Sequence, residues 1–448
     1  MQINRRSFVK SSVAAFGLPM IVPSTAFGAN EKIVMGCIGV GGMGTRNMRN
    51  FLGSDDCRVV AVCDVQRDRR EKAKNTVDQH YGDQGCALYN DYREVVARKD
   101  IDAVMIAAQD HWHSLIATAA ANAGKDMYCE KPTGLCVHDG QVIRAALRKN
   151  NRVFQSGMWQ RSLGNFRQGA ELALNGHLGK LKEIQVSVPA GKNFKNKFKG
   201  PYDPQPVPEN IDWKMWQGPA RQNPFNQGRI TYPDWYLIND YCEGWTTNWG
   251  VHHLDIAHWG CPALGQGRME VECEGTYYAD MGFADNIATW KAVFTYPNAL
   301  RMVFTDTSTM PAGTKFIGDK GWVYVNRGDK IESSTPDILQ IKPGENDKRL
   351  LPDGCTMDDV TTLKTKNGER VAYKKVHHQQ GLLDSMRSRK EPIAGIDATH
   401  VASTLGMIAG IANRLKVRLT WDWDSESFVG NDEANKMLVR PMYNGWKI

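Results

Sequence analysis

Several features that would assign the chain to a special class are missing from its sequence. No apolar run reaches the roughly 18 residues that a membrane-spanning helix requires. The ten cysteines include no C-x-x-C pair, and no disulfide pairing follows from their spacing. Basic residues exceed acidic ones by only 7 in 448, too small an excess to indicate nucleic-acid binding. The composition, 42% hydrophobic and 23% charged, is that of an ordinary globular chain.

The first 28 residues contain no acidic side chain, and their order of residue types is typical of an export signal. A basic start with the pair Arg5 and Arg6 leads into an apolar stretch at 13–22 and then to small residues up to Gly28. The arginine pair resembles a twin-arginine signal, and an amphipathic N-terminal helix is the alternative. We therefore expect residues 1–28 to be removed, which leaves a periplasmic or otherwise exported protein without a membrane segment. Removal lowers the net charge from +7 to +4.

A glycine-rich motif follows the first predicted strand, residues 32–39. Residues 39–44 fit G-x-G-x-x-G, and a helix is predicted directly after them. In this motif the first glycine permits a tight turn, the second lets the backbone approach a pyrophosphate, and the third lets the helix pack on the strand. The helix also directs its positive end at the phosphates. The predicted cofactor contacts in this loop are Gly39, Gly41, Gly42, Met43 and Gly44.

The second predicted strand, residues 58–63, ends at Asp64, about 20 residues beyond the motif. An acidic residue at this point suits the ribose 2′-hydroxyl of NAD. Arg67, Arg69 and Arg70 follow closely and could accommodate a 2′-phosphate, so NADP is not excluded. The motif and Asp64 together predict a dinucleotide site with NAD as the first candidate.

Strands and helices alternate through the first third of the chain. Apolar stretches at 103–108 and 126–129 are predicted as buried strands, with an alanine-rich helix at 115–123 between them. Such alternation is typical of a parallel, doubly wound sheet. The predicted fold class is therefore α/β, with a Rossmann domain over residues 30–156.

Residues 157–448 are predicted as an α+β substrate-binding domain built on an open, mainly antiparallel sheet. Its strand-like stretches lie at 183–188, 269–278, 288–296, 301–306 and 321–325. The polar residues 326–375 are expected to form a long insertion or irregular loops. A basic run at 192–199 is expected to be a solvated loop near the cleft and not a nucleic-acid site.

The tripeptide Glu130–Pro132 follows directly after the predicted strand at 126–129. Together with the glycine motif and the segment 110–113, it resembles the Gfo/Idh/MocA oxidoreductases, and the resemblance covers essentially all of the chain after the signal. Other stretches similar to this family are 155–161, 211–220 and 384–392. The resemblance implies an NAD(P)-dependent enzyme, cofactor contacts at Glu130 and Lys131, and homo-oligomers formed through the second sheet.

Lys131 is the first predicted catalytic residue. Oxidation of an alcohol removes the hydroxyl proton while a hydride goes to the nicotinamide, and a partly desolvated lysine beside that ring can accept the proton. In the family that the chain resembles, this lysine hydrogen-bonds the reacting hydroxyl. The alternative is a surface lysine that pairs with Glu130.

The second catalytic segment, residues 243–255, resembles a family helix that carries an acid/base histidine, and His252 takes that position. Positions i and i+4 of a helix share a face, so Asn248 and His252 are expected to point together. Asn248 stands where the family usually has an aspartate, and it can hydrogen-bond a sugar hydroxyl but carries no charge. His252, Asp255 and His258 are spaced i, i+3 and i+6, unlike helical metal pairs, so no metal is expected.

The remaining candidates come from aromatic and imidazole side chains. Aromatic faces stack on sugar rings while polar groups bind hydroxyls, and the alternative is that the tryptophans only fill a core. His253 is as easily a structural residue as a pocket residue. The predicted substrate contacts are Trp159, Arg161, Asn248, His252 and His253, and His111 and His113 are added to the cofactor contacts.

The sequence thus predicts an exported NAD(P)-dependent oxidoreductase that oxidises a hydroxyl, or reduces a keto group, of a sugar or glycoside. One alternative is a lyase, epimerase or glycoside hydrolase that regenerates its cofactor through a transient keto-sugar. Another alternative is a non-catalytic sugar sensor that retains the fold. No nucleic-acid partner is expected.

Overall fold

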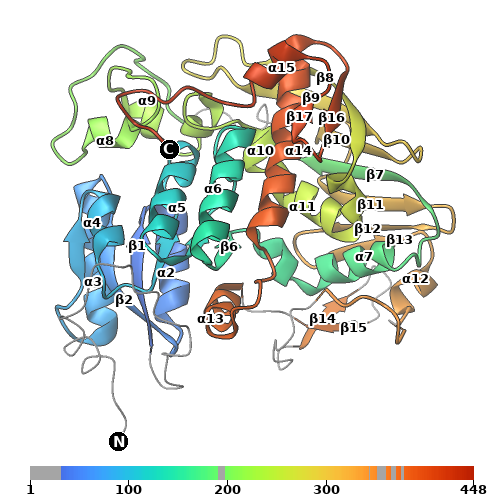
Figure 1. Ribbon diagram of the computed structural model, residues 1–448, viewed down its shortest axis with the longest axis horizontal. Coiled ribbons are helices and arrows are strands. Elements are labelled where there is room, and N and C mark those ends of the chain that lie inside the picture. The colour runs from blue at the N-terminus through green and yellow to red at the C-terminus, as the bar shows by residue number, and fades with distance from the viewer. Residues whose placement is uncertain (1–31, 190–196, 343, 351–359, 365–369, 375–377) are drawn as a thin grey trace, which may run out of the picture.

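The computed structural model describes residues 32–189, 197–342, 344–350, 360–364, 370–374 and 378–448. The predicted signal, residues 1–28, and most of the basic run at 192–199 lie outside the described residues. Figure 1 shows two bodies side by side, a blue-to-cyan α/β unit and a larger unit built around a second sheet. Among the helices that the structure describes, none has both the length and the apolar character needed to cross a bilayer.

The first sheet has the order β3-β2-β1-β4-β5-β6, and every pairing in it is parallel. The strands at its centre, β1, β4 and β5, are short and almost wholly buried, which explains their mainly apolar sequences. The strands are β1 Ile33–Ile38, β2 Cys57–Cys63, β3 Ala87–Tyr89, β4 Ala103–Ile106, β5 Asp126–Cys129 and β6 Phe154–Ser156. The helices between them are α2 Gly42–Leu52, α3 Arg67–Tyr81, α4 Tyr92–Ala97, α5 His113–Asn122 and α6 Val137–Asn150. This sheet confirms the predicted doubly wound Rossmann architecture.

The second sheet has the order β13-β12-β11-β7-β10-β9-β8-β16-β17. Its pairings are antiparallel apart from the parallel pair β7 and β10. Helices α7 Gly164–Leu174, α11 Gly250–Gly260 and α14 Ile396–Leu415 pack against it. The strands are β7 Leu181–Val188, β8 Arg268–Tyr277, β9 Ile287–Thr295, β10 Arg301–Asp306, β11 Gly313–Gly318, β12 Trp322–Asn326, β13 Lys330–Ser333, β16 Leu419–Asp422 and β17 Ser427–Phe428. The predicted open, mainly antiparallel sheet is therefore confirmed.

Short elements complete the second unit and its connections. The remaining α-helices are α8 Trp213–Gln217, α9 Gln227–Ile230, α10 Trp245–Asn248, α12 Pro336–Gln340, α13 His378–Ser388 and α15 Asp432–Lys436. The 3-10 helices are η2 Asp110–Trp112, η3 Trp159–Ser162, η5 Asp234–Leu237 and η6 Pro262–Gly265. Of these turns, η2 and η5 supply side chains to the cavity described below.

The expectation of irregular structure throughout 326–375 is wrong in part. Within the described residues of this region lie β13, α12 and a separate hairpin of β14 Val360–Lys364 and β15 Arg370–Lys374. The hairpin strands, VTTLK and RVAYK, are short runs whose β-branched residues and one tyrosine favour strands. Because the residues on both sides of these strands are polar, the overall composition of the region did not indicate a hairpin.

Late segments of the chain return to the first sheet. Leu382, Leu383 and Met386 of α13 belong to the same buried core as Phe51 of α2. Helix α14 packs against α6 of the Rossmann unit as well as against β8, and Figure 1 shows it standing between the two units. The predicted domain boundary at residue 156 stays a prediction. Helices α13 and α14 follow this boundary in the chain, yet both pack against elements of the Rossmann unit.

Candidate active site

A cavity of about 500 Å³ opens at the carboxyl ends of β1, β2, β4 and β5. The sheet order places β1 and β4 side by side with their crossovers running in opposite directions, which is where doubly wound sheets bind ligands. Nine of the residues predicted as site residues line this cavity: Gly39, Gly41, Gly42, Met43, Asp64, His113, Glu130, Lys131 and Asn248. The second unit adds Met215, Ile230, Tyr232, Trp235 and Tyr236.

The glycine loop has the geometry that its motif predicts. Gly39 has φ +77°, and a Cβ there would lie 2.5 Å from the nitrogen of Ala108. A Cβ on Gly44 would lie 1.8 Å from the carbonyl oxygen of Gly39, so only glycine lets α2 approach the strand end this closely. Gly42 faces open space, with nothing within 4 Å of a Cβ built there. The loop therefore leaves room for a ligand at the N-terminus of α2.

The N-terminus of α2 is left without competing anions. Its N-cap residue, Gly41, has no side chain to cap the helix, and no acidic residue lies in its first turn. Free backbone N–H groups and the positive end of the helix dipole therefore face the cavity. Both features suit the pyrophosphate of NAD.

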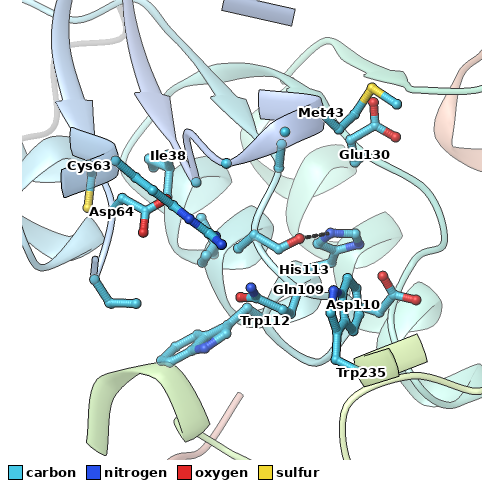
Figure 2. A pocket seen from close by; sticks show the side chains of 18 of the residues that line it. Ile38, Met43, Cys63, Asp64, Gln109, Asp110, Trp112, His113, Glu130 and Trp235 are labelled. Atoms are coloured by element: carbon cyan, nitrogen blue, oxygen red, sulfur yellow. Dashed lines mark hydrogen bonds between the residues drawn. The ribbon is translucent and has the colours of Figure 1, made fainter. Parts of the chain in front are cut away.

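Asp64 lies on the opposite wall of the cavity from Asp110 and Trp235 (Figure 2). Its carboxylate accepts hydrogen bonds at 2.9 Å from the backbone nitrogens of Val40 and Gln66. Burial raises the pKa of Asp64, and the nearby Arg69 opposes this effect. Asp64 therefore both braces the loop after β1 and offers an acceptor for a ribose hydroxyl.

Lys131 and Asn248 join the two units at the cavity. The Lys131 ammonium donates to the carbonyl oxygen of Asn248 at 2.9 Å and to its side-chain oxygen at 3.0 Å. The amide nitrogen of Asn248 donates to the carboxylate of Asp110 at 2.9 Å. Because Asp110 accepts from the nitrogen, the amide oxygen must face the lysine. Asp110 was not singled out from the sequence, although its position four residues after the end of β4 could have signalled a site residue.

Two further predicted residues have defined places in this wall. The ring nitrogens of His113 lie 2.7 Å from the carbonyl oxygen of Pro132 and 3.0 Å from that of Ala108, which holds the imidazole at the base of the cavity. Glu130 accepts a hydrogen bond at 2.9 Å from Asn47 of α2. Figure 2 shows Glu130 beside Met43, at the side of the cavity formed by the glycine loop.

His111 is not among the residues that line this cavity. Residues 110–112 form the 3-10 helix η2 and not an extended strand end, so consecutive side chains point in different directions. The ring contacts Trp216 and Tyr241, and its Nε2 lies 3.1 Å from the carbonyl oxygen of Trp216. Burial lowers the pKa of His111 to about 4. The structure therefore uses His111 to pack α8 against the Rossmann unit.

The segment around His252 also departs from the expected single helix. Helix α10 ends at Asn248 and α11 begins at Gly250, so the i, i+4 relation between Asn248 and His252 does not hold on one continuous helix. His252 is buried and does not line the cavity, with its ring 5.7 Å from that of Trp249 and 6.5 Å from that of Trp159. Burial first, and then the charges of Arg327 and Lys131, hold the pKa of His252 well below its ordinary value. The imidazole is therefore neutral.

Two of the predicted substrate contacts are engaged within the protein. Arg161 donates to both carboxylate oxygens of Asp255 at 2.6 to 3.0 Å and also to the carbonyl oxygen of Ile393. The Nδ1 atom of His253 lies 3.0 Å from the hydroxyl of Thr314 beneath the second sheet. Neither residue lines the cavity. Within the described residues, no group of three or more His, Cys, Asp or Glu side chains is arranged to hold a metal.

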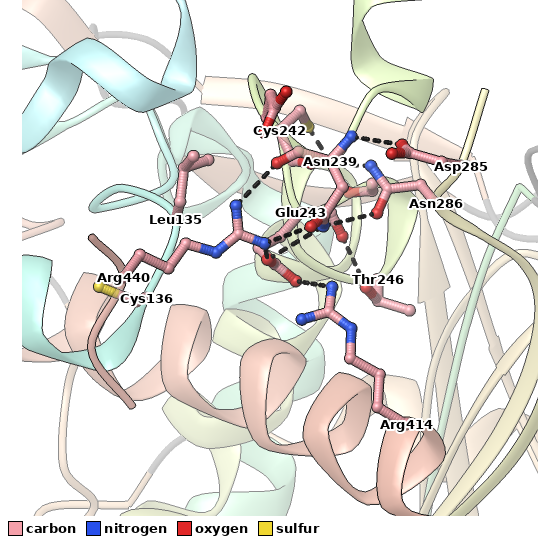
Figure 3. Close-up of polar contacts among 12 residues, drawn as sticks. Leu135, Cys136, Asn239, Cys242, Glu243, Thr246, Asp285, Asn286, Arg414 and Arg440 are labelled. Atoms are coloured by element: carbon pink, nitrogen blue, oxygen red, sulfur yellow. Dashed lines mark hydrogen bonds and ion pairs between the residues drawn. The ribbon is translucent and has the colours of Figure 1, made fainter. Parts of the chain in front are cut away.

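A cluster of charged residues surrounds the buried Glu243, next to the start of α10 (Figure 3). The sequence did not indicate this cluster. The carboxylate of Glu243 accepts from Arg440 of the C-terminal segment, from Arg414 of α14 at 3.3 Å and from Asn239 at 3.2 Å. Burial alone would raise the pKa of Glu243, but the charges of Arg414 and Arg440 outweigh it and hold the pKa below its usual value. Glu243 precedes Gly244, the N-cap residue of α10, so the cluster fixes the start of the helix that carries Asn248.

Two family models match the chain. Residues 33–158 match an oxidoreductase family described by its NAD-binding Rossmann fold. Residues 165–372 match the C-terminal alpha/beta domain of an oxidoreductase family. The two matched ranges cover the whole of the first sheet and the second sheet apart from β16 and β17.

Similar proteins agree with these matches. An uncharacterized oxidoreductase of Bacillus subtilis is 24% identical over 322 residues, which are 70% of this chain and 80% of that protein. An inositol 2-dehydrogenase of Salmonella typhimurium is 32% identical over 146 residues, 32% of this chain, and the match spans only 42% of that enzyme. A scyllo-inositol dehydrogenase of Lactobacillus casei, solved with NAD(H) and scyllo-inositol, superposes with a TM-score of 0.54 at 16% identity over 87% of this chain and 99% of that chain. This last likeness shows a shared fold.

Proposed function

The chain belongs to the Gfo/Idh/MocA oxidoreductases, and from this membership we propose that it uses NAD to oxidise a hydroxyl of a sugar or glycoside, or to reduce the corresponding keto group. Its sequence relatives include inositol dehydrogenases, whose substrates are sugar-like polyols. The half-buried aromatic rings of Trp235 and Tyr236 on the cavity wall suit the apolar face of such a ring.

The arrangement of Lys131, Asn248 and Asp110 is the observation that carries this proposal. NAD, when bound, supplies the acceptor for the hydride. In its neutral amine form, Lys131 accepts the proton that the substrate hydroxyl loses and becomes the ammonium, and Asn248 holds the lysine nitrogen in one place through its two oxygens. Asp110 prevents the Asn248 amide from turning its nitrogen toward the lysine. This fixed geometry is what a proton acceptor needs.

His252 is the proposed second acid/base group. Its neutral imidazole can take up a proton, and within the described residues its Nδ1 atom has no hydrogen-bond partner. His252 lies four positions after Asn248, the residue that holds Lys131. The backbone nitrogen of His252 donates to the carbonyl oxygen of Trp249.

The purified mature protein tests this function. Nucleotide that co-purifies is identified first, and reduced nicotinamide is then followed with a panel of polyols, sugars and glycosides. Lys131→Ala is expected to lower kcat by about 10²- to 10⁴-fold while NAD still binds. Lys149→Ala, an exposed lysine on α6, is the matched control and leaves turnover unchanged. Unchanged turnover in both Lys131→Ala and His252→Ala contradicts the proposed roles.

The same assay separates the other functions. Product that accumulates without net reduction of NAD supports a lyase, epimerase or hydrolase that regenerates its cofactor. A protein that binds sugar but turns over nothing on the panel is a sensor. A protein that binds neither NAD nor NADP contradicts the oxidoreductase proposal.

We further propose that the protein is exported by the twin-arginine route and that it forms homo-oligomers through the second sheet. Lysine at both Arg5 and Arg6 is expected to leave the protein in the cytoplasm of the producing cell, as checked by fractionation. Light scattering of the mature protein measures the oligomeric state, and a monomer contradicts the second proposal.

A further inference from the structure

Arg327 lies in the turn between β12 and β13 with its guanidinium between two tryptophan rings. Its central carbon is 4.5 Å from the ring centre of Trp159 and 4.1 Å from that of Trp249. Its Nε donates to the side-chain oxygen of Gln160 at 2.9 Å. These three contacts hold the planar group in one orientation.

The guanidinium has unused donors. The Nη2 atom of Arg327 is buried and has no hydrogen-bond partner in the part of the chain that the structure describes. No carboxylate among the described residues forms an ion pair with it, and stacking on tryptophan satisfies none of its N–H groups. A buried, unsatisfied donor is unfavourable, so this group is arranged for a partner that enters from outside the protein.

Charges around Arg327 have the same sign. Burial first, and then the charge of Arg46, lowers the pKa of Arg327 to about 10, so the guanidinium stays charged at neutral pH. Arg46 lines the cofactor cavity. Arg327 and Lys131 both act on His252 as positive charges. Arg46, Lys131 and Arg327 therefore make this junction of the two units electropositive.

The position of Arg327 connects it to the proposed reaction. Trp249, on which it stacks, directly follows Asn248, which holds Lys131. His252 contacts the same two tryptophan rings as Arg327 does. Trp159, Trp249 and Arg327 are each partly exposed, so they form an aromatic surface with a cation between its two rings.

We propose that Arg327 binds the carboxylate of the substrate and that the substrate is an acidic sugar of the uronic or aldonic acid type. The fork of N–H groups on a guanidinium matches a carboxylate, and the parts of the two tryptophan rings that stay exposed beside the guanidinium suit the apolar face of a pyranose. Neutral polyols need no cation in their binding site, so Arg327 makes the site selective for acidic sugars. This inference rests on the proposed function and names its substrate class.

Binding is measured first, so that the result does not depend on turnover. Glucuronate is expected to raise the Tm of the NAD-loaded wild-type protein at concentrations at which glucose does not. Arg327→Met keeps the stacking volume but removes the charge, and it is expected to abolish the glucuronate effect. Arg327→Lys keeps a charge without the fork and is expected to retain a small part. Arg301→Gln, a half-exposed arginine on β10, is the control and leaves the effect intact.

Kinetics then separates this inference from the proposed function. In an active enzyme, Arg327→Met is expected to raise KM for the acidic sugar at least tenfold, with kcat and the Kd for NAD within about twofold of wild type. Arg327-dependent glucuronate binding without any dehydrogenase activity contradicts the proposed function and leaves the carboxylate site standing. Equal binding of glucose and glucuronate, or a loss of NAD affinity in Arg327→Met, overturns the inference, and the second result assigns the arginine to a cofactor phosphate.

Discussion

The half-buried Arg440 forms an ion pair with the buried Glu243 and so connects the C-terminal segment to the turn before α10 (Figure 3). The two residues are 197 positions apart in the chain. The same guanidinium also donates to the backbone and side-chain oxygens of Asn239, each at 2.7 Å. The residue that holds Lys131 therefore depends on a contact made near the end of the sequence.

Glu243→Gln is expected to destabilise the protein strongly. The substitution leaves the half-buried Arg414 and Arg440 beside a neutral amide, and the cost approaches the roughly 3–5 kcal/mol of breaking a fully buried pair. Urea unfolding at pH 7 measures the loss. Because α10 is also released, kcat is expected to fall while the Kd for NAD stays close to that of the parent. Glu272→Gln breaks the exposed pair with Arg418 and is the control, and an equal loss in both variants would contradict the prediction.

Two neighbouring glycines are expected to respond differently to alanine. Gly44→Ala places a methyl group 1.8 Å from the oxygen of Gly39, so the backbone must move, and the free energy of unfolding falls by about 1–3 kcal/mol or more. Gly42→Ala meets nothing within 4 Å and leaves stability unchanged or slightly raised. If the pyrophosphate occupies the space beside Gly42, this second variant binds NAD more weakly, as titration calorimetry can measure. Equal free energies of unfolding for the two variants would contradict this prediction.

Asp64 is expected to set the preference for NAD. Asp64→Ser removes the charged acceptor and is expected to raise the Kd for NAD about tenfold or more, the equivalent of one charge-assisted hydrogen bond. Arg69, which also lines the cavity, remains available to a 2′-phosphate, so the ratio of NADP to NAD affinity rises. Fluorescence titration with both nucleotides measures this ratio. Asp64→Asn retains an acceptor oxygen for Val40 or Gln66 and serves to separate loop stability from cofactor preference.

Acid is expected to destabilise the protein through its buried histidines. Burial lowers the pKa of His253 to about 3 and that of His111 to about 4, whereas both titrate near 6.5 in the unfolded chain. Between these values the unfolded state binds more protons, so stability is complete above pH 6.5 and falls as the pH drops. Each histidine contributes a slope of up to about 1.4 kcal/mol per pH unit.

Urea unfolding at pH 7.5, 6 and 5 checks this slope. His253→Gln is expected to flatten it by up to one proton, because the glutamine does not titrate. His80→Gln, at an exposed position on α3, is the control and keeps the slope of the parent. Stability that rises on acidification would refute the prediction.

The parts of the site that could be predicted are those in which local chain geometry decides the outcome. The glycine loop, Asp64, Glu130 and Lys131 each follow a strand of a parallel sheet, and such ends meet at one edge. A motif of six residues contains its own turn, helix start and packing contact. The local sequence pattern therefore predicts where these residues lie in the folded site.

The parts that could not be predicted depend on partners far away in the chain. Arg161 was expected to bind substrate, but Asp255, 94 residues later, takes its guanidinium. The pairing of Asn248 with His252 assumed a continuous helix, but α10 ends at Asn248 and α11 begins at Gly250, with no local signal such as proline to mark the break. The position of Arg327 follows from a strand order that no local pattern reveals.

The described cysteines have a practical consequence for following how the molecule opens. All nine are reduced and buried, and burial raises the pKa of thiols such as Cys57 and Cys273 to about 12. Thiolate, the reactive form, is therefore scarce in the native state, and alkylation of these sites requires local or global opening. Cys37 and Cys63 lie in the Rossmann sheet and Cys273 in the second sheet. Pulse alkylation with and without NAD therefore measures the opening of each unit separately. Peptide mapping of the alkylated cysteines then shows which unit unfolds first.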